Sequence, residues 1–276
     1  MDPALRVSDR DFGRFQALIN REAGIWLAPV KKALLVGRLA RRLRELGIGS
    51  YAEYFERVTG DEGERVRMLD AICTNETQFF REPRHFEFLE QRVFPAWRAE
   101  AEAGSRPRHA SVWSAACSTG EEPYSLAMAL LSSLPGWNVE VLASDLSTKV
   151  LARAEAGVWS IERAKQIPKP YLGAYMLQGY GAQSGLMKAG PEIRAAIRFA
   201  RVNLSGEPWP QGPFDLVFCR NVLIYFDRVT KVRVVARLLD RLGPAAFLFL
   251  GHAESLTGVT ERARSVIATI YQRGSR

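Results

Sequence analysis

Three segments of the sequence place polar side chains directly after short runs of apolar residues. They are SAACSTGEEPYS at 114–125, ASDLS at 143–147 and FDLVFCRNVLIYF at 214–226. An apolar run that ends in small or polar residues is typical of a buried strand that leads into a loop. Because ligands of open α/β sheets bind outside the carboxyl ends of the strands, we expect these three segments to form one binding site.

The first of these segments indicates the chemical class of the ligand. Gly120 lets the backbone turn sharply into a helix that has Pro123 in its first turn. The fingerprint G-x-G-x-x-G of dinucleotide-binding loops is absent, and Glu121 and Glu122 stand where a phosphate would have to approach. Two carboxylates favour a ligand that has no phosphate and carries positive charge. S-adenosylmethionine, with its sulfonium and ammonium groups, fits this description.

The other two segments admit more than one interpretation. Asp145 ends the second predicted strand, about 25 residues after Gly120, and an acid in this position can accept both hydroxyls of a ribose. It could also cap the helix expected at 147–157, and the two roles can coexist. In the third segment, Asn221 can hydrogen-bond a base or a carboxylate and Tyr225 offers a phenol, although turn chemistry would also account for Asn221.

A fourth segment, TNETQFFREP at 74–83, combines residues that a buried helix rarely holds together. The polar residues Asn75, Thr77 and Arg81 flank the aromatic pair Phe79 and Phe80, and a proline ends the segment. The pattern by itself leaves open what this segment contacts.

The elements before this segment read as helical. Residues 1–90 are expected to form an N-terminal all-helical domain, because no strand pattern occurs there. Its clearest helix lies at 33–47, where leucines share one face and Gly47 is a stop signal. The leucines of that face are Leu35, Leu39, Leu43 and Leu46. A second helix is expected to start after Ser50, a plausible cap.

The rest of the chain follows a different pattern. Residues 91–110 are expected to be a linker, because the stretch AEAEAGSRPRHA at 99–110 has linker composition. From 111 to 276, strands and helices alternate, which predicts an α/β fold with a parallel sheet covered on both faces. The alternation breaks at about 160–200, where many glycines and the lack of a helical period predict a small inserted β-hairpin subdomain.

Composition limits the remaining possibilities. The formal net charge of +8 and the sequence pI of about 9.6 predict a surface that attracts polyanions or acidic proteins. No apolar run is long enough to span a bilayer, and the N-terminus lacks the apolar stretch of a signal peptide. The three cysteines and three scattered histidines predict reduced, mostly buried thiols, no metal site and a cytoplasmic protein.

Together, these motifs resemble those of the CheR family of chemotaxis receptor methyltransferases. The segments that carry the resemblance are TNETQFFRE, VWSAACSTGEEPYSLAM, ASDLS, FDLVFCRNVLIYFD and GHAESL, and it runs over nearly the whole chain. It implies a Rossmann-like, S-adenosylmethionine-dependent methyltransferase sheet at 111–276, a small inserted antiparallel β-subdomain and an N-terminal helical domain that docks the receptor. Cys117 replaces an alanine of the usual SAAASTGEEPYS pattern, which is a small apolar change.

The resemblance also implies how the fourth segment works. By similarity it folds over the cofactor, while Phe79 and Phe80 anchor it against the sheet domain. The cofactor contacts that the resemblance implies are Asn75, Thr77, Arg81, one of Glu121 and Glu122, Asp145, Asn203, Leu204, Arg220 and Asn221.

The reaction that the resemblance implies is methylation of glutamate side chains on the cytoplasmic helices of chemoreceptors, with methyl esters and S-adenosylhomocysteine as products. We expect Arg81 and Tyr225 nearest the reacting atoms. Arg81 would orient the acceptor carboxylate through a charge-assisted hydrogen bond. The alternative for Arg81 is a surface ion pair with Glu82 or Glu87.

The partners follow from the same resemblance. Receptor methylation regions are acidic, so the face of Arg38, Arg41 and Arg42 could dock one, or could be an ordinary solvated face. In some family members the β-subdomain binds a short peptide at the receptor's C-terminus by strand addition. One competing hypothesis is a methyltransferase that acts on nucleic acid or a small molecule, with nucleic acid disfavoured as a partner. Another is a non-catalytic adaptor that binds the cofactor, which the presence of Arg81 and Tyr225 disfavours.

Overall fold

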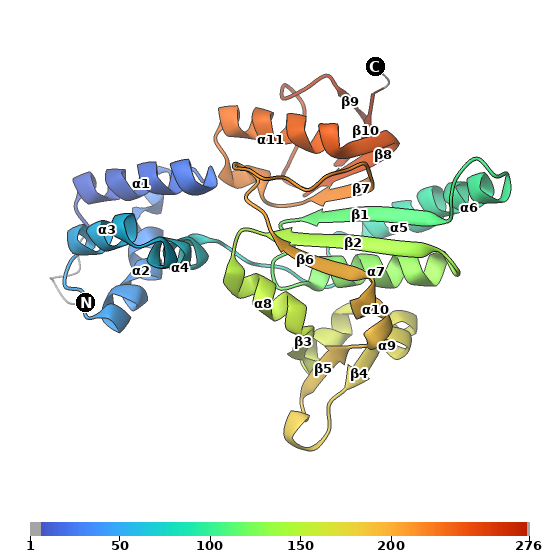
Figure 1. The fold of residues 1–276 in the computed structure, drawn as a ribbon, viewed down its shortest axis with the longest axis horizontal. Coiled ribbons are helices and arrows are strands. Elements are labelled where there is room, and N and C mark those ends of the chain that lie inside the picture. The colour runs from blue at the N-terminus through green and yellow to red at the C-terminus, as the bar shows by residue number, and fades with distance from the viewer. Residues whose placement is uncertain (1–6, 275–276) are drawn as a thin grey trace.

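The computed structural model describes residues 7–274 and has a helical part and an α/β part (Figure 1). Helices α1 to α4 form the helical part at one end of the molecule. The large sheet lies in the middle, and a small three-stranded sheet projects from one side of it (Figure 1). This arrangement confirms the predicted architecture of a helical domain, an α/β domain and an inserted β-subdomain.

The large sheet has seven strands in the order β6-β2-β1-β7-β8-β10-β9 within the described chain. Their bounds are β1 (His109–Ala115), β2 (Asn138–Asp145), β6 (Ile197–Arg201), β7 (Phe214–Cys219), β8 (Leu242–Leu250), β9 (Ala263–Ile267) and β10 (Ile270–Arg273). The first five strands in this order are parallel, while β10 runs antiparallel to β8 and β9 antiparallel to β10. The order reverses at β1, so the loops after β1, β2 and β7 open side by side.

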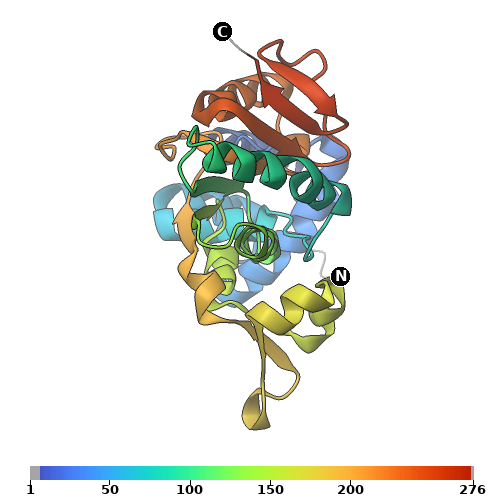
Figure 2. The ribbon, with the colours of Figure 1, turned by 90° about the vertical axis from the view of Figure 1, so that its right-hand side faces the viewer.

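Helices cover both faces of this sheet (Figures 1 and 2). On one face, α7 (Glu121–Ser133) packs against a core that contains the stacked rings of Phe218 and Phe249, whose centroids are 4.2 Å apart. On the other face, α11 (Arg228–Arg241) packs on a second core that contains Trp113. Helix α8 (Thr148–Ala156) lies against β2 and β6. Because both faces of the central strands are buried, β7 is an almost continuous apolar run rather than an alternating one.

The helical part consists of α1 (Asp9–Ala23), a short 3-10 turn η2 (Pro29–Lys31), α2 (Lys32–Leu46), α3 (Tyr51–Gly60) and α4 (Glu62–Ile72). It has its own apolar core, in which Leu35, Leu39 and Leu43 are fully buried as predicted. Two local signals also act as predicted. Gly47 ends α2 with φ of 67°, and the Ser50 hydroxyl caps α3 by accepting from the Glu53 N–H at 3.1 Å.

The three arginines on α2 lie in different surroundings. Arg42 donates from Nε and Nη2 to the two carboxylate oxygens of buried Glu64, both at 2.6 Å. Arg38 donates to the Ile72 carbonyl and the Thr74 hydroxyl, so it ties α2 to the end of α4. Arg41 has an 80% exposed side chain and, among the described residues, pairs only with Glu45 of the same helix. Of the three predicted docking residues, two therefore make internal contacts.

Residues 91–110 differ from the predicted linker. They include most of a continuous helical segment made of α5 (Pro83–Phe88), the π-helical turn η3 (Leu89–Val93) and α6 (Phe94–Glu102). Phe94 and Trp97 of this segment are buried in the core of the α/β part. The extended connection between the two parts lies earlier, at 73–82. The predicted helical domain is likewise shorter than 1–90, because α5 packs with the sheet and not with α1 to α4.

The inserted β-subdomain is larger than the predicted hairpin. Its strands, in the order β3-β5-β4, are β3 (Val158–Ser160), β4 (Met176–Gln178) and β5 (Leu186–Ala189), all paired antiparallel. It also contains η4 (Ile161–Gln166), α9 (Lys169–Tyr175), η5 (Gly181–Gln183) and α10 (Pro191–Ala195). The short helix α9 was missed because seven residues with two glycine or proline positions show no helical period.

Some classes of site are not found in the part of the chain that the structure describes. No helix there is long and apolar enough to cross a membrane. No group of three or more histidine, cysteine, aspartate or glutamate side chains is arranged to hold a metal ion among residues 7–274. Cys117 and Cys219 are buried free thiols, and Cys73 is half-buried.

Candidate active site

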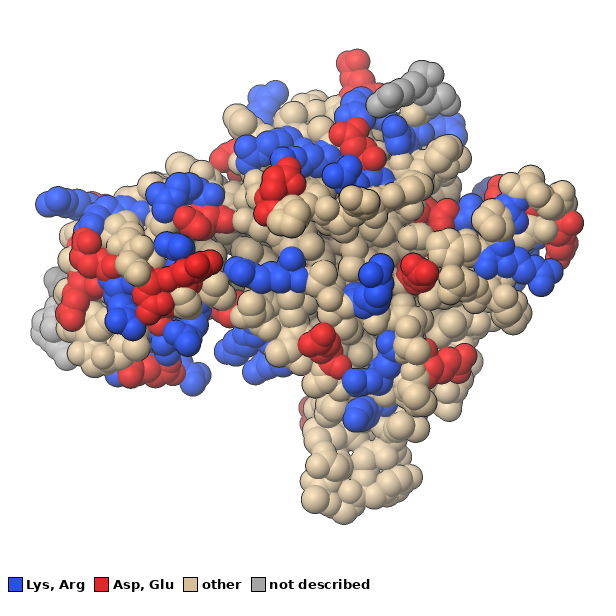
Figure 3. All heavy atoms as spheres, viewed as in Figure 1, with Lys and Arg blue, Asp and Glu red and all other residues tan. Residues whose placement is uncertain are grey.

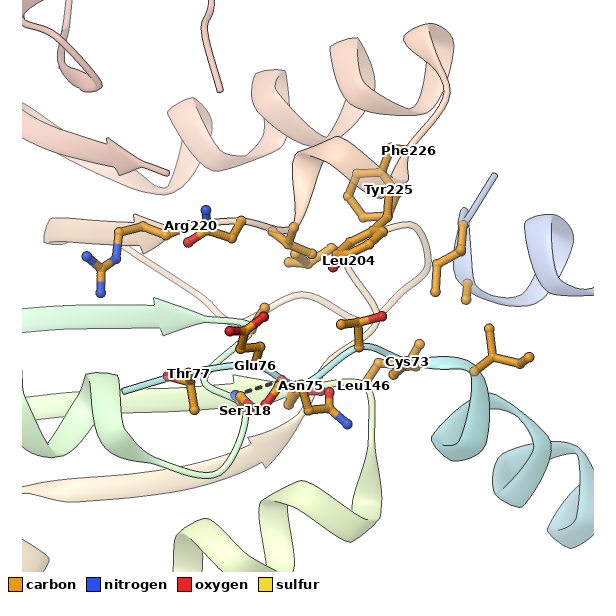
Figure 4. Close-up of a pocket in the computed structure, with 18 of the residues that line it drawn as sticks. Cys73, Asn75, Glu76, Thr77, Ser118, Leu146, Leu204, Arg220, Tyr225 and Phe226 are labelled. Carbon is orange, nitrogen blue, oxygen red and sulfur yellow. Dashed lines mark hydrogen bonds between the residues drawn. The ribbon is translucent and has the colours of Figure 1, made fainter. Parts of the chain in front are cut away.

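A pocket lies between the carboxyl ends of β1, β2 and β7 and the helical part. Its walls come from four regions: the connection at 73–77, the loops after the three strands, the segment 202–204 and residues of the helical part between Ala23 and Leu34. Figure 4 shows Asn75 and Thr77 on one side and Arg220 and Tyr225 on the other, all around one space. The sheet, the connection and the helical part thus build one site.

Asp145 lies at the floor of this pocket, at the last position of β2. It is buried, and its two oxygens accept the N–H groups of Ser118 at 2.9 Å and Ser147 at 3.0 Å. Burial raises the pKa of this carboxyl, although the backbone donors oppose the shift. Ser147, and not Asp145, caps α8, since the Ser147 hydroxyl accepts from the Val150 N–H at 3.4 Å. Asp145 is therefore not the cap of α8, and it lines the pocket.

A buried cluster of charges forms the inner wall. The guanidinium of Arg220 donates from Nε to Glu122 at 2.6 Å and lies 3.5 Å from a carboxylate oxygen of Glu82. Its Nη1 also donates to the Arg81 carbonyl at 2.5 Å. The second Glu122 oxygen accepts from the Ser114 hydroxyl at 2.7 Å. Arg220 therefore joins the end of β7 to α7 and to the connection.

The charges of this cluster do not cancel. One guanidinium stands against two buried carboxylates, and the Glu82 oxygen nearest Arg220 has no hydrogen-bond partner within residues 7–274. His85 adds no charge at neutral pH, because burial, helped by the positive charge of Arg220 and by His252, lowers its pKa to about 3. A buried excess of one negative charge favours a cationic ligand group in the pocket. The ammonium of S-adenosylmethionine fits that requirement.

Glu121 and Glu122 have separate environments. Glu122 lines the pocket, whereas Glu121 accepts from the Thr119 hydroxyl at 2.7 Å and does not line it. Both follow Gly120, which begins α7 with φ of 99°. A Cβ on Gly120 would lie 3.1 Å from the backbone of Ala154, so a larger residue would push α7 and α8 apart.

The connection at 73–82 is held to the α/β part on both sides. The Asn75 carbonyl accepts from the Ser118 hydroxyl at 3.0 Å, and the Thr77 carbonyl accepts from Arg163 at 3.1 Å. Phe79 and Phe80 anchor its far end: Phe79 packs edge-on against Trp159 at 5.0 Å, and Phe80 stacks on Tyr171 at 5.2 Å. Much of this anchor belongs to the β-subdomain, which therefore supports the pocket.

Arg81 is not a surface ion pair. Its guanidinium donates to the Glu76 carbonyl at 3.0 Å and lines the pocket. Glu82 instead faces Arg220 and His85. The guanidinium of Arg81 has further N–H donors besides the one that binds the Glu76 carbonyl.

The loop after β7 forms the opposite wall and contains Asn221 and Tyr225. Asn221 has φ of 59°, an uncommon left-handed conformation for a residue other than glycine. Buried Glu254 supports it by accepting the N–H groups of Asn221 at 2.8 Å, Gly251 at 2.7 Å and Ile224 at 3.3 Å. A Cβ at Gly251 would lie 2.4 Å from the side-chain Nδ2 of Asn221 and 2.8 Å from its backbone nitrogen, so this position requires glycine.

Glu254 is a functional-site residue that the sequence reasoning missed. It lies in GHAESL, a segment noticed only for its similarity. A glutamate just after an apolar strand was the available signal, but only the fold shows that it supports the loop after a different strand. Burial raises the pKa of Glu254, while its backbone donors oppose the shift.

Asn203 and Leu204 line the pocket where the α/β part meets α1. The Asn203 amide is committed to structure, since Nδ2 donates to the Glu22 carbonyl at 2.6 Å and Oδ1 accepts from the Ser205 N–H at 3.0 Å. Leu204 is buried and supplies an apolar surface. These two residues therefore join the halves of the pocket.

The decrease in the free energy of unfolding below neutral pH is expected to depend on His85. Its ring contacts the Thr269 hydroxyl at 2.8 Å on one side and faces Arg220, Glu82 and His252 on the other. Because the folded-state pKa is about 3 against an ordinary 6.5, the unfolded chain takes up the proton first as the pH falls. The stability is thus fully present above pH 6.5 and is lost progressively toward pH 3, at about 1.4 kcal/mol per pH unit below 6.5.

Urea titrations at pH 7.0, 6.0 and 5.0 measure this loss. His85→Gln, which keeps a polar side chain for Thr269, is expected to flatten the decline, whereas the matched control His109→Gln is expected to leave it unchanged. If the free energy of unfolding declined equally in all three proteins, a group other than His85 would control the loss of stability at acid pH.

The comparisons with known proteins agree with this geometry. The chain matches the family model described as CheR methyltransferase, all-alpha domain, at residues 10–73, and the model described as CheR methyltransferase, SAM binding domain, at residues 75–272. The boundary between the two matches falls in the extended connection.

Individual relatives match over nearly their full length. Chemotaxis protein methyltransferase 2 of Pseudomonas aeruginosa is 39% identical over 95% of this chain and 92% of its own. The chemotaxis protein methyltransferase of Klebsiella aerogenes is 39% identical over 94% of this chain and 88% of its own. The one of Escherichia coli is 37% identical over 98% and 93%. The chain therefore belongs to the CheR family of S-adenosylmethionine-dependent methyltransferases.

Proposed function

We propose that this protein transfers a methyl group from S-adenosylmethionine to glutamate side chains on the cytoplasmic helices of chemoreceptors, and that it does so in the cytoplasm. The observation that carries the proposal is one pocket, at the strand ends of the α/β part, that a polar connection and the helical part close from outside. Relatives with similar sequences over nearly their full length are chemotaxis protein methyltransferases.

The residues of the pocket suit each part of the cofactor. Asp145 would accept the ribose hydroxyls, as expected for an acid at the end of the second strand. Glu122, in the cluster with excess negative charge, would receive the ammonium. The guanidinium of Arg81 and the side-chain amides of Asn75 and Asn221 would bind other polar groups of the cofactor. Leu204 would cover an apolar part of it. When bound, S-adenosylmethionine supplies an electrophilic methyl group on its sulfonium.

The acceptor needs little activation. A glutamate carboxylate is already ionised at neutral pH, so no general base is required. The protein has to hold that oxygen in line, about 3 Å from the methyl carbon, and to exclude water. We assign the orientation of the carboxylate to Arg81 and Tyr225, which line the same pocket from opposite walls.

The structure reduces the number of α2 arginines that are available for docking. Arg38 and Arg42 already bind groups of the helical part, so Arg41 is the residue of the three that is free to meet an acidic helix. We also propose that the β-subdomain binds a receptor's C-terminal peptide by strand addition along β4, where Leu177 is exposed. Titration of receptor tail peptides that gives no detectable binding would remove this tether.

Incubation with isotope-labelled S-adenosylmethionine tests the proposed reaction. Purified chemoreceptor cytoplasmic fragments are expected to take up label that is released as methanol in mild base, because methyl esters are base-labile. RNA, DNA and a receptor fragment with its glutamates changed to alanine serve as the controls. Base-stable label, or label in nucleic acid, would contradict the proposal and favour the alternative methyltransferase class.

A further inference from the structure

Large apolar side chains are exposed on the outer rim of the pocket. Trp26 is 46% exposed, Val30 87%, Ile224 49% and Val229 76%. Two cations lie among them in the chain, Lys31 and Arg228. We call these six residues the rim surface.

Two segments distant in sequence bring the rim surface together. The Trp26 N–H donates to the Tyr225 carbonyl at 2.7 Å, and Ile25 and Phe226 form an antiparallel bridge. The Lys31 ammonium lies 5.7 Å from the centre of the Tyr225 ring. The carboxyl end of α1 and the start of α11 also meet here, since a Cβ on Gly24 would lie 3.0 Å from the Thr230 side chain. Figure 1 shows the same meeting of α1 with the region before α11.

The pairing separates an inner from an outer side. Ile25, Leu27 and Phe226 line the pocket, as does Lys31 of the rim surface, whereas the exposed apolar members Trp26, Val30, Ile224 and Val229 do not. Side chains of successive residues in extended chain point to opposite faces, so Trp26 is directed away from the pocket interior. Its backbone, not its indole, makes the structural contact with Tyr225. The exposed side chains are therefore not required to build the pocket.

The rim surface combines apolar area with unpaired positive charge. Lys32 pairs with Asp9 at 2.7 Å, whereas neither Lys31 nor Arg228 forms a side-chain hydrogen bond or ion pair with another group between residues 7 and 274. The Lys31 ammonium instead faces the Tyr225 ring. Over the helical part, by contrast, Lys and Arg alternate with Asp and Glu, as the mixed colours show (Figure 3). Exposed apolar patches rimmed by charge mark interaction sites on soluble proteins.

We infer that the rim surface binds the apolar stripe of the acceptor helix while its target glutamate enters the pocket. This inference rests on the proposed function. An amphipathic acidic helix has an apolar stripe for Trp26 and Val30 and carboxylates for Lys31 and Arg228. The position supports this occupant, because Trp26 is paired through its backbone with Tyr225, the residue assigned to orient the acceptor carboxylate.

Charge-introducing variants test the inference. Trp26→Glu and Val30→Glu place a carboxylate against the acidic helix and remove apolar contact. For methyl transfer to a receptor cytoplasmic fragment, the KM for the fragment is expected to rise at least 10-fold, with kcat changed less than 3-fold. Calorimetry with S-adenosylhomocysteine is expected to give the wild-type Kd, because neither side chain lines the pocket.

Ile267→Glu is the matched control, since Ile267 is 44% exposed on the edge strand β9, away from the pocket. It is expected to keep the wild-type KM. Rim variants with wild-type KM would overturn the inference and leave the proposed function standing. A wild-type protein that binds S-adenosylhomocysteine but methylates no receptor fragment would overturn both.

Discussion

Arg220→Met is expected to lower the free energy of unfolding by about 3–5 kcal/mol and to abolish measurable binding of S-adenosylhomocysteine. The guanidinium is buried, and it is the cation that faces both Glu122 and Glu82. Methionine fills much of the volume but leaves two buried carboxylates without a counter-charge. Loss of the Arg220 guanidinium also removes the donor to the Arg81 carbonyl, so the connection at 73–82 loses a contact with the end of β7. Urea denaturation and calorimetry measure the two effects.

Further variants separate the two effects. Arg233→Met, on the exposed side of α11, is the matched control and is expected to change unfolding by less than about 0.5 kcal/mol. Arg220→Met combined with Glu122→Gln should recover part of the stability, because one stranded carboxylate becomes neutral, but not the binding. If Arg220→Met bound S-adenosylhomocysteine normally, the cluster would have no part in the cofactor site.

Arg42→Met is expected to destabilise the helical part by about 3–5 kcal/mol. It removes a two-point contact with Glu64, which is fully buried and also accepts from the Tyr54 hydroxyl at 2.9 Å. Burial of Glu64 acts to raise its pKa, but the hydrogen bonds from Arg42 and Tyr54 outweigh it, so the pKa is lowered. The carboxylate is thus ionised at neutral pH, and losing Arg42 leaves it buried with weaker partners.

Arg41→Met is the neighbouring control. Arg41 is exposed and its one ion pair in the described part of the chain is with Glu45, so its loss is expected to change the free energy of unfolding by less than about 0.5 kcal/mol. Far-UV circular dichroism during urea unfolding measures both variants. If Arg42→Met had wild-type stability, Arg42 would not be needed for the fold and would again be a candidate docking residue. If Arg41→Met alone raises the KM for a receptor fragment, the docking charge on α2 resides in Arg41.

Local chemistry made much of the fold predictable. The leucine spacing, the Gly47 stop and the Ser50 cap are interactions within a few residues, and all three occur as expected. The parallel sheet was also predictable, because strands buried on both faces must be apolar throughout. Asp145 and Arg220 could be placed in one site because parallel strands end at the same edge.

Long-range packing decided what the local pattern could not. Residues 91–110 look like a linker beyond Trp97, yet Phe94 and Trp97 pack into the core of the sheet domain. The segment 169–175 is too short for a periodic signal, and its helix is stabilised by neighbours such as α7. Short helices depend on tertiary contacts that no local window of sequence contains.

The sequence by itself determined which chemical groups are present and which strand ends carry them, since those depend on residue type and on the hydrophobic period. Only the tertiary structure decided how these groups are used. Arg41 and Arg42 are adjacent and identical in type, yet one is solvated and the other is bound to a buried carboxylate. The environments of Glu121 and Glu122 differ in the same way, and of these two residues only Glu122 lines the pocket. The reason is that burial and charge pairing depend on what folds against a side chain, and those partners lie tens of residues away.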